Sequence, residues 1–223
     1  MEGKAAFDAL VKKIGERCPA FRIRYKEDFW WEKALGLLLR LTGINPNYYT
    51  SYITTWGDSV HWPTKKMLEA NWDSAFKVLA HEYIHLWRKK VTGGWYLVRW
   101  ASPQCLTLLA LLALLAIWNL WFLTALVFLL FVLPWASPGR TDEEMRGYTM
   151  NLAVNIWRYG EVLDGTIDWI VPQFTGRWYF WMCRDEAAVR KRLTSEIGNI
   201  QTGVLLKGED GVPYQDVHDI IKG

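Results

Sequence analysis

The segment His81-Glu82-Tyr83-Ile84-His85 has the residue types and the spacing of a metal-binding helix. Two histidines four positions apart lie on the same face of an α-helix, so both imidazoles can reach one zinc ion. The glutamate after the first histidine lies beside them without being a ligand, and it can take a proton from the attacking water and pass it to a leaving amine. The pattern predicts a Zn²⁺ site at His81 and His85, with Glu82 as the catalytic base of a peptidase.

A catalytic zinc site also needs a third protein ligand and keeps a fourth position for water. The extended motif with a third histidine is excluded, because its last position is Val91. A carboxylate on a second helix is the usual solution, and Glu144 is the predicted ligand. Tyr148 lies one turn further on the same face, where we expect it to hydrogen-bond a ligand or the oxyanion. The competing ligands are Asp142, Glu143, Glu161 and His61.

Helices and a small hairpin are predicted before and around the motif. Residues 5–17 have the apolar spacing of an amphipathic helix, and residues 21–25 alternate as a strand does. An apolar helix is expected from Phe29 to Leu41 with Asp28 as its N-cap. Residues 48–62 predict a β-hairpin that turns at Gly57-Asp58, and the motif helix is expected to begin at Asp73 or Ser74 and to end at Gly93-Gly94.

After Ser137-Pro138-Gly139 the sequence again mixes charged and apolar residues, as soluble domains do. Residues 142–159 and 185–197 are expected to form helices. Residues 164–180 are rich in Trp and are expected to be irregular, with breaks at Pro172 and Gly176. The wider segment 157–181 is expected either to lie on a bilayer surface or to pack the soluble domain. The last two dozen residues are expected to form a loose tail.

No charged residue occurs between Arg99 and Arg140, and residues 106–133 are almost entirely apolar. A helix that is apolar in every direction belongs in lipid or in the core of a much larger protein. We therefore expect residues 95–135 to form an inserted membrane hairpin, with arms over 95–117 and 120–135 and Asn119 at the tip.

Metal geometry and charge both bear on the topology of this hairpin. If His81, His85 and Glu144 share one zinc ion, they lie on one side of the membrane, so the chain between them crosses an even number of times or not at all. Basic residues flank both ends of the apolar stretch, which places both ends in the cytoplasm by the positive-inside rule. The aromatic residues expected in the near-side interfacial belt are Trp95, Tyr96, Trp100 and Trp135.

The order of these features resembles the integral-membrane metallopeptidases of the CAAX prenyl protease and HtpX type. That family has an HExxH helix, then hydrophobic helices, then a second helix with a glutamate ligand, which corresponds here to Glu144-Met145-Arg146-Gly147-Tyr148. Tyr148 stands where the family usually has Asp, and Gly147 where it has Ala. The resemblance implies that an edge strand of the 50–62 hairpin pairs with an extended substrate, although a plain core hairpin is the alternative.

The length and composition of the chain limit the remaining hypotheses about its fold and function. The 223 residues suit a single zincin-like catalytic domain over 1–223, mainly helical within the α+β class, with the hairpin inserted. A net charge of +3 without a basic, aromatic-interleaved run argues against nucleic acid as a partner. The leading hypothesis is a membrane-associated zinc metallopeptidase that acts on proteins or peptides. The alternatives are a non-enzymatic membrane protein, viral or host-interacting, with a degenerate motif, and a cytosolic zinc peptidase whose hairpin packs on a partner.

Overall fold

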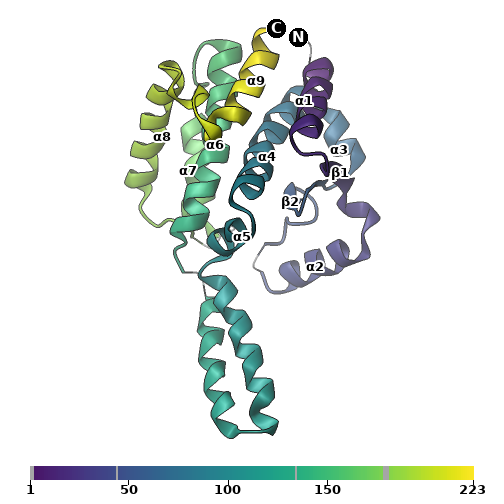
Figure 1. Ribbon diagram of the computed structural model, residues 1–223, viewed down its shortest axis with the longest axis vertical. Coiled ribbons are helices and arrows are strands. Elements are labelled where there is room, and N and C mark those ends of the chain that lie inside the picture. The colour runs from purple at the N-terminus through teal and green to yellow at the C-terminus, as the bar shows by residue number, and fades with distance from the viewer. Residues whose placement is uncertain (1–2, 44, 134, 178–180) are drawn as a thin grey trace.

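The structure, a computed structural model, describes residues 3–43, 45–133, 135–177 and 181–223. It is 73% helical with one three-stranded sheet, which confirms the predicted α+β class. A helical body carries both termini at one end, and a long hairpin projects from the other end (Figure 1).

The helices, with η for 3₁₀, are α1 (Gly3–Arg17), η1 (Lys26–Asp28), α2 (Trp30–Leu41), α3 (Lys65–Ala70), α4 (Trp72–Thr92), α5 (Gly94–Ala101), η2 (Gln104–Ile117), η3 (Leu120–Val132), α6 (Pro138–Tyr159), α7 (Thr166–Thr175), α8 (Glu186–Gln201), η5 (Val204–Leu206), η6 (Glu209–Gly211) and α9 (Val212–Lys222).

The sheet has the strand order β1-β3-β2, with β1 (Arg22–Tyr25) parallel to β3 (Ser59–Trp62) and β2 (Thr54–Trp56) antiparallel to it. Gly57 makes the turn between β2 and β3 at a φ of 62°, a conformation that glycine adopts without strain. The predicted hairpin is therefore confirmed from residue 54 onward. Residues 48–51 form turns instead of a strand, and β2 is left at the edge of the sheet.

The core forms around α4, which packs against α1, α6 and α9. Phe76, Leu79 and Tyr83 of α4 are fully buried. The expected loose C-terminal tail is wrong, because α9 is a packed helix. Its Asp216 is buried and accepts hydrogen bonds from Tyr83 of α4 (2.8 Å) and from Arg17 of α1 (3.1 Å). These long-range bonds fix the C-terminus to the centre of the body.

Three local predictions also need correction. Asp28 is not the N-cap of α2, because it lies in the short helix η1 and Phe29 occupies the capping position. α4 begins at Trp72, one residue before the earlier of the two expected starts, and Asn71 caps it by accepting a hydrogen bond from the Ser74 amide. The segment expected to break at Pro172 is instead the continuous helix α7, which contains that proline.

The hairpin consists of η2 and η3, which run side by side and reverse at Trp118-Asn119 as expected. Its first arm is shorter than predicted, because α5 meets η2 at 95° and stays with the body. Within the described residues, no helix taken singly has both the length and the apolar character to cross a bilayer; the bent pair α5 and η2 reaches that standard only together. At the base, the amide of Gln104 donates to the Trp135 carbonyl (3.1 Å), so both arms join the body at one place.

Candidate metal centre

The two histidines of the motif project from α4 toward α6. Their ring centroids are 5.0 Å apart, as the four-residue helical spacing requires. Both side chains are buried, with His81 8% and His85 5% exposed. Both imidazoles face α6, where a third ligand can meet them.

Glu144 of α6 supplies the third donor atom. Its Oε2 lies 3.6 Å from Nε2 of His81 and 3.8 Å from Nε2 of His85, and all three donor atoms lie within 4.8 Å of one another. Four-coordinate zinc with bonds of ~2.0–2.1 Å holds neighbouring ligand atoms about 3.4 Å apart. The donor set therefore fits a zinc ion after a small movement, and it has the two-histidine, one-carboxylate chemistry of a catalytic site.

A glycine on α6 makes this close approach between the helices possible. A Cβ placed on Gly147 would lie 2.4 Å from Nε2 of His81, far inside van der Waals contact. Even alanine would displace the imidazole nitrogen that faces Glu144. This contact gives a physical reason for glycine at position 147.

The outer nitrogens of both histidines have partners of their own. The hydroxyl of Tyr96 lies 3.0 Å from Nδ1 of His85, and the amide of Asn151 lies 3.3 Å from Nδ1 of His81. The Oδ1 of Asn151 has no hydrogen-bond partner among the described residues, and rotating the amide would let it accept the Nδ1 proton. With the Asn151 amide turned in this way and the Tyr96 hydroxyl accepting, the protons would lie on the two Nδ1 atoms and each Nε2 would be free to bind a metal.

The carboxylate of Glu144 is oriented by α5. The indole of Trp100 donates to Oε1 of Glu144 at 3.1 Å, which leaves Oε2 facing the histidines. The prediction that Tyr96 and Trp100 form an interfacial belt is wrong, because both side chains point into this cluster. Sequence analysis did not identify Tyr96, Trp100 and Asn151 as partners of the site. Helical spacing could have indicated them, because Tyr96 and Trp100 are four residues apart just after the motif helix and Asn151 is seven residues after Glu144.

Burial and charge affect the two carboxylates in opposite ways. Burial alone would raise the pKa of Glu144, but His85, His81 and the bond from Trp100 outweigh it and lower this pKa to about 2. Burial raises the pKa of Glu82, against the effects of His85 and of a 2.6 Å hydrogen bond from Thr55 of β2. These shifts favour the anionic form of Glu144, which a cation ligand needs, and they make Glu82 a better proton acceptor.

Tyr148 lies next to the cluster, as its position on α6 predicted. Its ring meets the His81 ring edge to face at 4.9 Å and packs against Phe174 of α7 at 5.4 Å. These contacts fix the plane of the His81 imidazole. A hydrogen bond from the Tyr148 hydroxyl to a reacting oxyanion stays a prediction.

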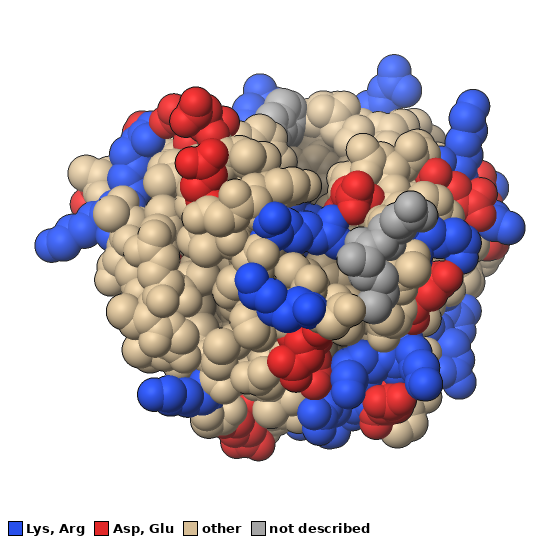
Figure 2. All heavy atoms as spheres, turned by 90° about the horizontal axis from the view of Figure 1, so that it is seen from above, with Lys and Arg blue, Asp and Glu red and all other residues tan. Residues whose placement is uncertain are grey.

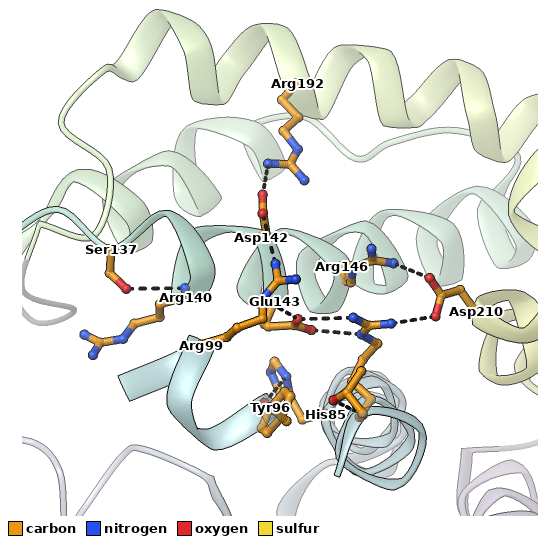
Figure 3. A network of polar contacts seen from close by, with 12 residues as sticks. His85, Tyr96, Arg99, Ser137, Arg140, Asp142, Glu143, Arg146, Arg192 and Asp210 are labelled. Atoms are coloured by element: carbon orange, nitrogen blue, oxygen red, sulfur yellow. Dashed lines mark hydrogen bonds and ion pairs between the residues drawn. The ribbon is translucent and has the colours of Figure 1, made fainter. Parts of the chain in front are cut away.

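Glu143 and Asp142, two competitors for the ligand position, belong to an ion-pair network on the neighbouring face of α6 (Figure 3). Glu143 is 1% exposed and accepts from Arg88 of α4 at 3.1 Å. Asp142 pairs with Arg99 of α5 and with Arg192 of α8. The network holds α4 and α5 against α6. Both carboxylates are paired with arginines there and do not face the two histidines of the motif.

The other two competitors are also outside the cluster. His61 is buried on β3 with its Nδ1 2.9 Å from Oε1 of Glu32. Glu161 is exposed beyond the end of α6. Among the described residues, His81, His85 and Glu144 are the one group of three or more metal-ligating side chains close enough to share an ion.

Comparisons of the chain with protein-family models, with curated proteins and with solved structures found no match.

Proposed function

We propose that the protein is a membrane-associated, zinc-dependent metallopeptidase with a zincin-like catalytic domain. The observation that carries the proposal is the convergence of His81, His85 and Glu144 within 4.8 Å, with Glu82 next to them on α4. The sequence favoured Glu144 over four competing ligands, and the hydrogen bonds around the three side chains support the proposal, because outer partners of this kind orient zinc ligands.

The chain's own residues have separable roles in peptide hydrolysis. Zinc, when bound, polarises a carbonyl and lowers the pKa of a water at its open position to about 7. Glu82 accepts the proton of the attacking water and returns it to the leaving amine, a role that a raised pKa favours. Thr55 holds the Glu82 carboxylate in place through its 2.6 Å hydrogen bond.

The same bond puts the edge strand beside the reacting groups. β2 ends the sheet order β1-β3-β2, and Thr55 at its centre reaches Glu82. An extended peptide that adds to this edge would run along the active helix, so we propose a protein or peptide substrate bound by β-augmentation.

Membrane association is proposed for the hairpin η2–η3. At about 2.0 Å per residue, the 14 residues of η2 extend about 28 Å, slightly less than the ~30 Å hydrocarbon core, so the hairpin is proposed to enter the bilayer and turn back near its far side. Both arms join the body at one place, so the chain that enters the bilayer also returns to the side of the catalytic residues. The basic flanks favour the cytoplasmic side.

Elemental analysis of the purified full chain tests the site. We expect about one zinc per chain in the wild type and in Glu161→Ala, an exposed carboxylate control, and no zinc in Glu144→Ala. Zinc-free wild type from a chelator-free preparation would refute the metal centre and favour the non-enzymatic alternative.

Activity is tested with Glu82→Gln, which keeps the size of the side chain but cannot take up the proton. Hydrolysis of an unstructured peptide library should fall by roughly 10²–10⁴-fold while zinc stays bound. Equal hydrolysis by both proteins would show that Glu82 is not the base.

A further inference from the structure

Helix α2 turns its apolar face away from the protein. Trp30, Leu37, Leu38 and Leu41 are 79%, 57%, 57% and 77% exposed. With Ala34 they recur at helical spacing, so they form a single stripe along one side of the helix. A helix that packs on a soluble core normally buries such a stripe.

The opposite, less apolar side is the one that faces the body. Glu32 is fully buried, and its Oε2 accepts a 2.6 Å hydrogen bond from the Tyr48 hydroxyl. Gly36 packs so closely on Tyr49 that a Cβ there would lie 2.7 Å from the tyrosine Cβ. Rotating α2 to bury its leucines would break both contacts, so the outward orientation is specified by the residues on its inner side.

The position of α2 relates this stripe to the hairpin. In Figure 1, α2 lies at the end of the body from which the hairpin projects, near the level of α5, and runs across the long axis. α5 exposes Trp95 and Leu97, each 63% exposed, at the same end. Figure 2 shows that the opposite end is studded with charged side chains of both signs.

We propose that α2 docks into the interfacial layer of the bilayer that the hairpin enters, with its axis along the membrane surface. The inference rests on the proposed membrane insertion of η2–η3. A stripe of leucines with one Trp is typical of helices that lie in the interface, and exposed Lys33 and Arg40 border it, where they can contact anionic headgroups.

Docking at this second point has a consequence for substrate choice. Trp31 of α2 contacts Trp56 of β2 with ring centroids 6.0 Å apart, so the edge strand lies directly behind the docked helix. The peptide bound there would be a segment close to the membrane surface, which makes the juxtamembrane parts of membrane proteins the substrate class.

Depth-dependent quenching tests the docking in the full chain. An environment-sensitive fluorophore is attached to Leu38→Cys after the native cysteines Cys18, Cys105 and Cys183 are replaced by serine. The protein is reconstituted into phosphatidylcholine and phosphatidylglycerol vesicles with nitroxides at shallow or deep acyl positions. Matched probes at Leu114→Cys in η2 and at Lys12→Cys on α1 report the hairpin and the distant end.

We expect the residue 38 probe to shift to the blue and to be quenched more by shallow than by deep nitroxides, because an interfacial helix sits ~5–10 Å into the headgroup and acyl boundary. The residue 114 probe should be quenched, and the residue 12 probe should not. Adding Leu37→Glu beside the probe, at a position exposed enough to leave the fold intact, should abolish quenching at residue 38 only.

Three results would overturn the inference. Quenching at residue 114 without quenching at residue 38 would remove the docking of α2 and leave hairpin insertion standing. Quenching at neither residue would remove membrane insertion itself. A blue-shifted residue 38 probe without lipid, together with a doubled mass in light scattering, would identify a second copy of the chain as the occupant.

Discussion

Two buried clusters in this protein combine histidine with glutamate, and only one of them is arranged for a metal. At His61, one imidazole lies 2.9 Å from Oε1 of Glu32, while the Tyr48 hydroxyl donates to Oε2 at 2.6 Å. Oε2 of that carboxylate is taken by Tyr48, and Oε1 faces a single imidazole nitrogen. At Glu144, Oε1 is held by Trp100, and Oε2 faces two imidazole nitrogens at 3.6 and 3.8 Å.

The comparison shows that burial of a histidine and a glutamate is not sufficient for a metal site. In the α4–α6 cluster, three possible ligand atoms face one point: the two histidine Nε2 atoms and Oε2 of Glu144. Neighbouring side chains contact the other polar atom of each of these residues. Tyr96 and Asn151 lie against the two Nδ1 atoms there. The His61 cluster has one imidazole and a nearby buried lysine, Lys26, and it is suited to holding α2 on the sheet.

The largest effect should come from removing one histidine from each cluster. His85→Ala takes away a ligand, so its zinc affinity should fall by more than the roughly 10–100-fold typical of outer hydrogen-bond partners. His61→Ala should keep full zinc occupancy, because Nδ1 of His61 faces Glu32. Competition with a chromophoric chelator measures both zinc affinities. Equal losses of affinity in the two variants would show that the α4–α6 cluster is not the metal site.

Gly147→Ala should be nearly as damaging to the metal site. The added methyl group would lie 2.4 Å from Nε2 of His81, so the imidazole must move off the ligand position. We expect roughly 100-fold weaker zinc binding, at the upper end of outer-contact effects. The same change at Gly198 of α8, where a Cβ has nothing within 4 Å, is the control, and it should stabilise the fold by about 0.5–1 kcal/mol.

Tyr96→Phe and Trp100→Phe sharpen the comparison by removing one orienting contact each. Each should weaken zinc binding by roughly 10–100-fold and leave the thermal midpoint of the metal-free protein little changed. Trp95→Phe, at a 63% exposed position on the same helix, is the matched control. Unaltered affinity in both variants would mean that α5 does not orient the ligands.

Lys26→Met should have the smallest effect on zinc and a distinct effect on stability. Burial lowers the pKa of Lys26 to about 8 from 10.5. Between these values the unfolded chain binds a proton that the folded chain does not, so stability rises with pH through that window. From pH 7.5 to 10, the wild type should gain about 2–3 kcal/mol of unfolding free energy relative to Lys26→Met.

Urea unfolding at both pH values measures that difference. Lys33→Met, an exposed lysine on α2, serves as the control and should show no comparable change between the two pH values. A constant difference between wild type and Lys26→Met would show that the lysine keeps its proton in the folded state throughout this range.

Local sequence determined much of the secondary structure and half of the candidate site. The spacing of His81 and His85 is a property of any α-helix, and so is their orientation to one side. The Gly57-Asp58 turn and the uncharged stretch with Asn119 at its centre also predicted the hairpins that the structure contains. Each of these features depends on residues that are near one another in the chain.

Only the tertiary structure decided which side chains complete the site. Glu143 and Glu144 are adjacent and chemically identical, but they point about 100° apart on α6, toward Arg88 and toward the histidines respectively. The 95° bend between α5 and η2 leaves α5 on the body, where Tyr96 and Trp100 contact the cluster, and hydrogen bonds to Asp216 hold the C-terminal helix on α1 and α4. Helix packing sets these directions, and it depends on contacts between residues distant in the chain, which local periodicity does not encode.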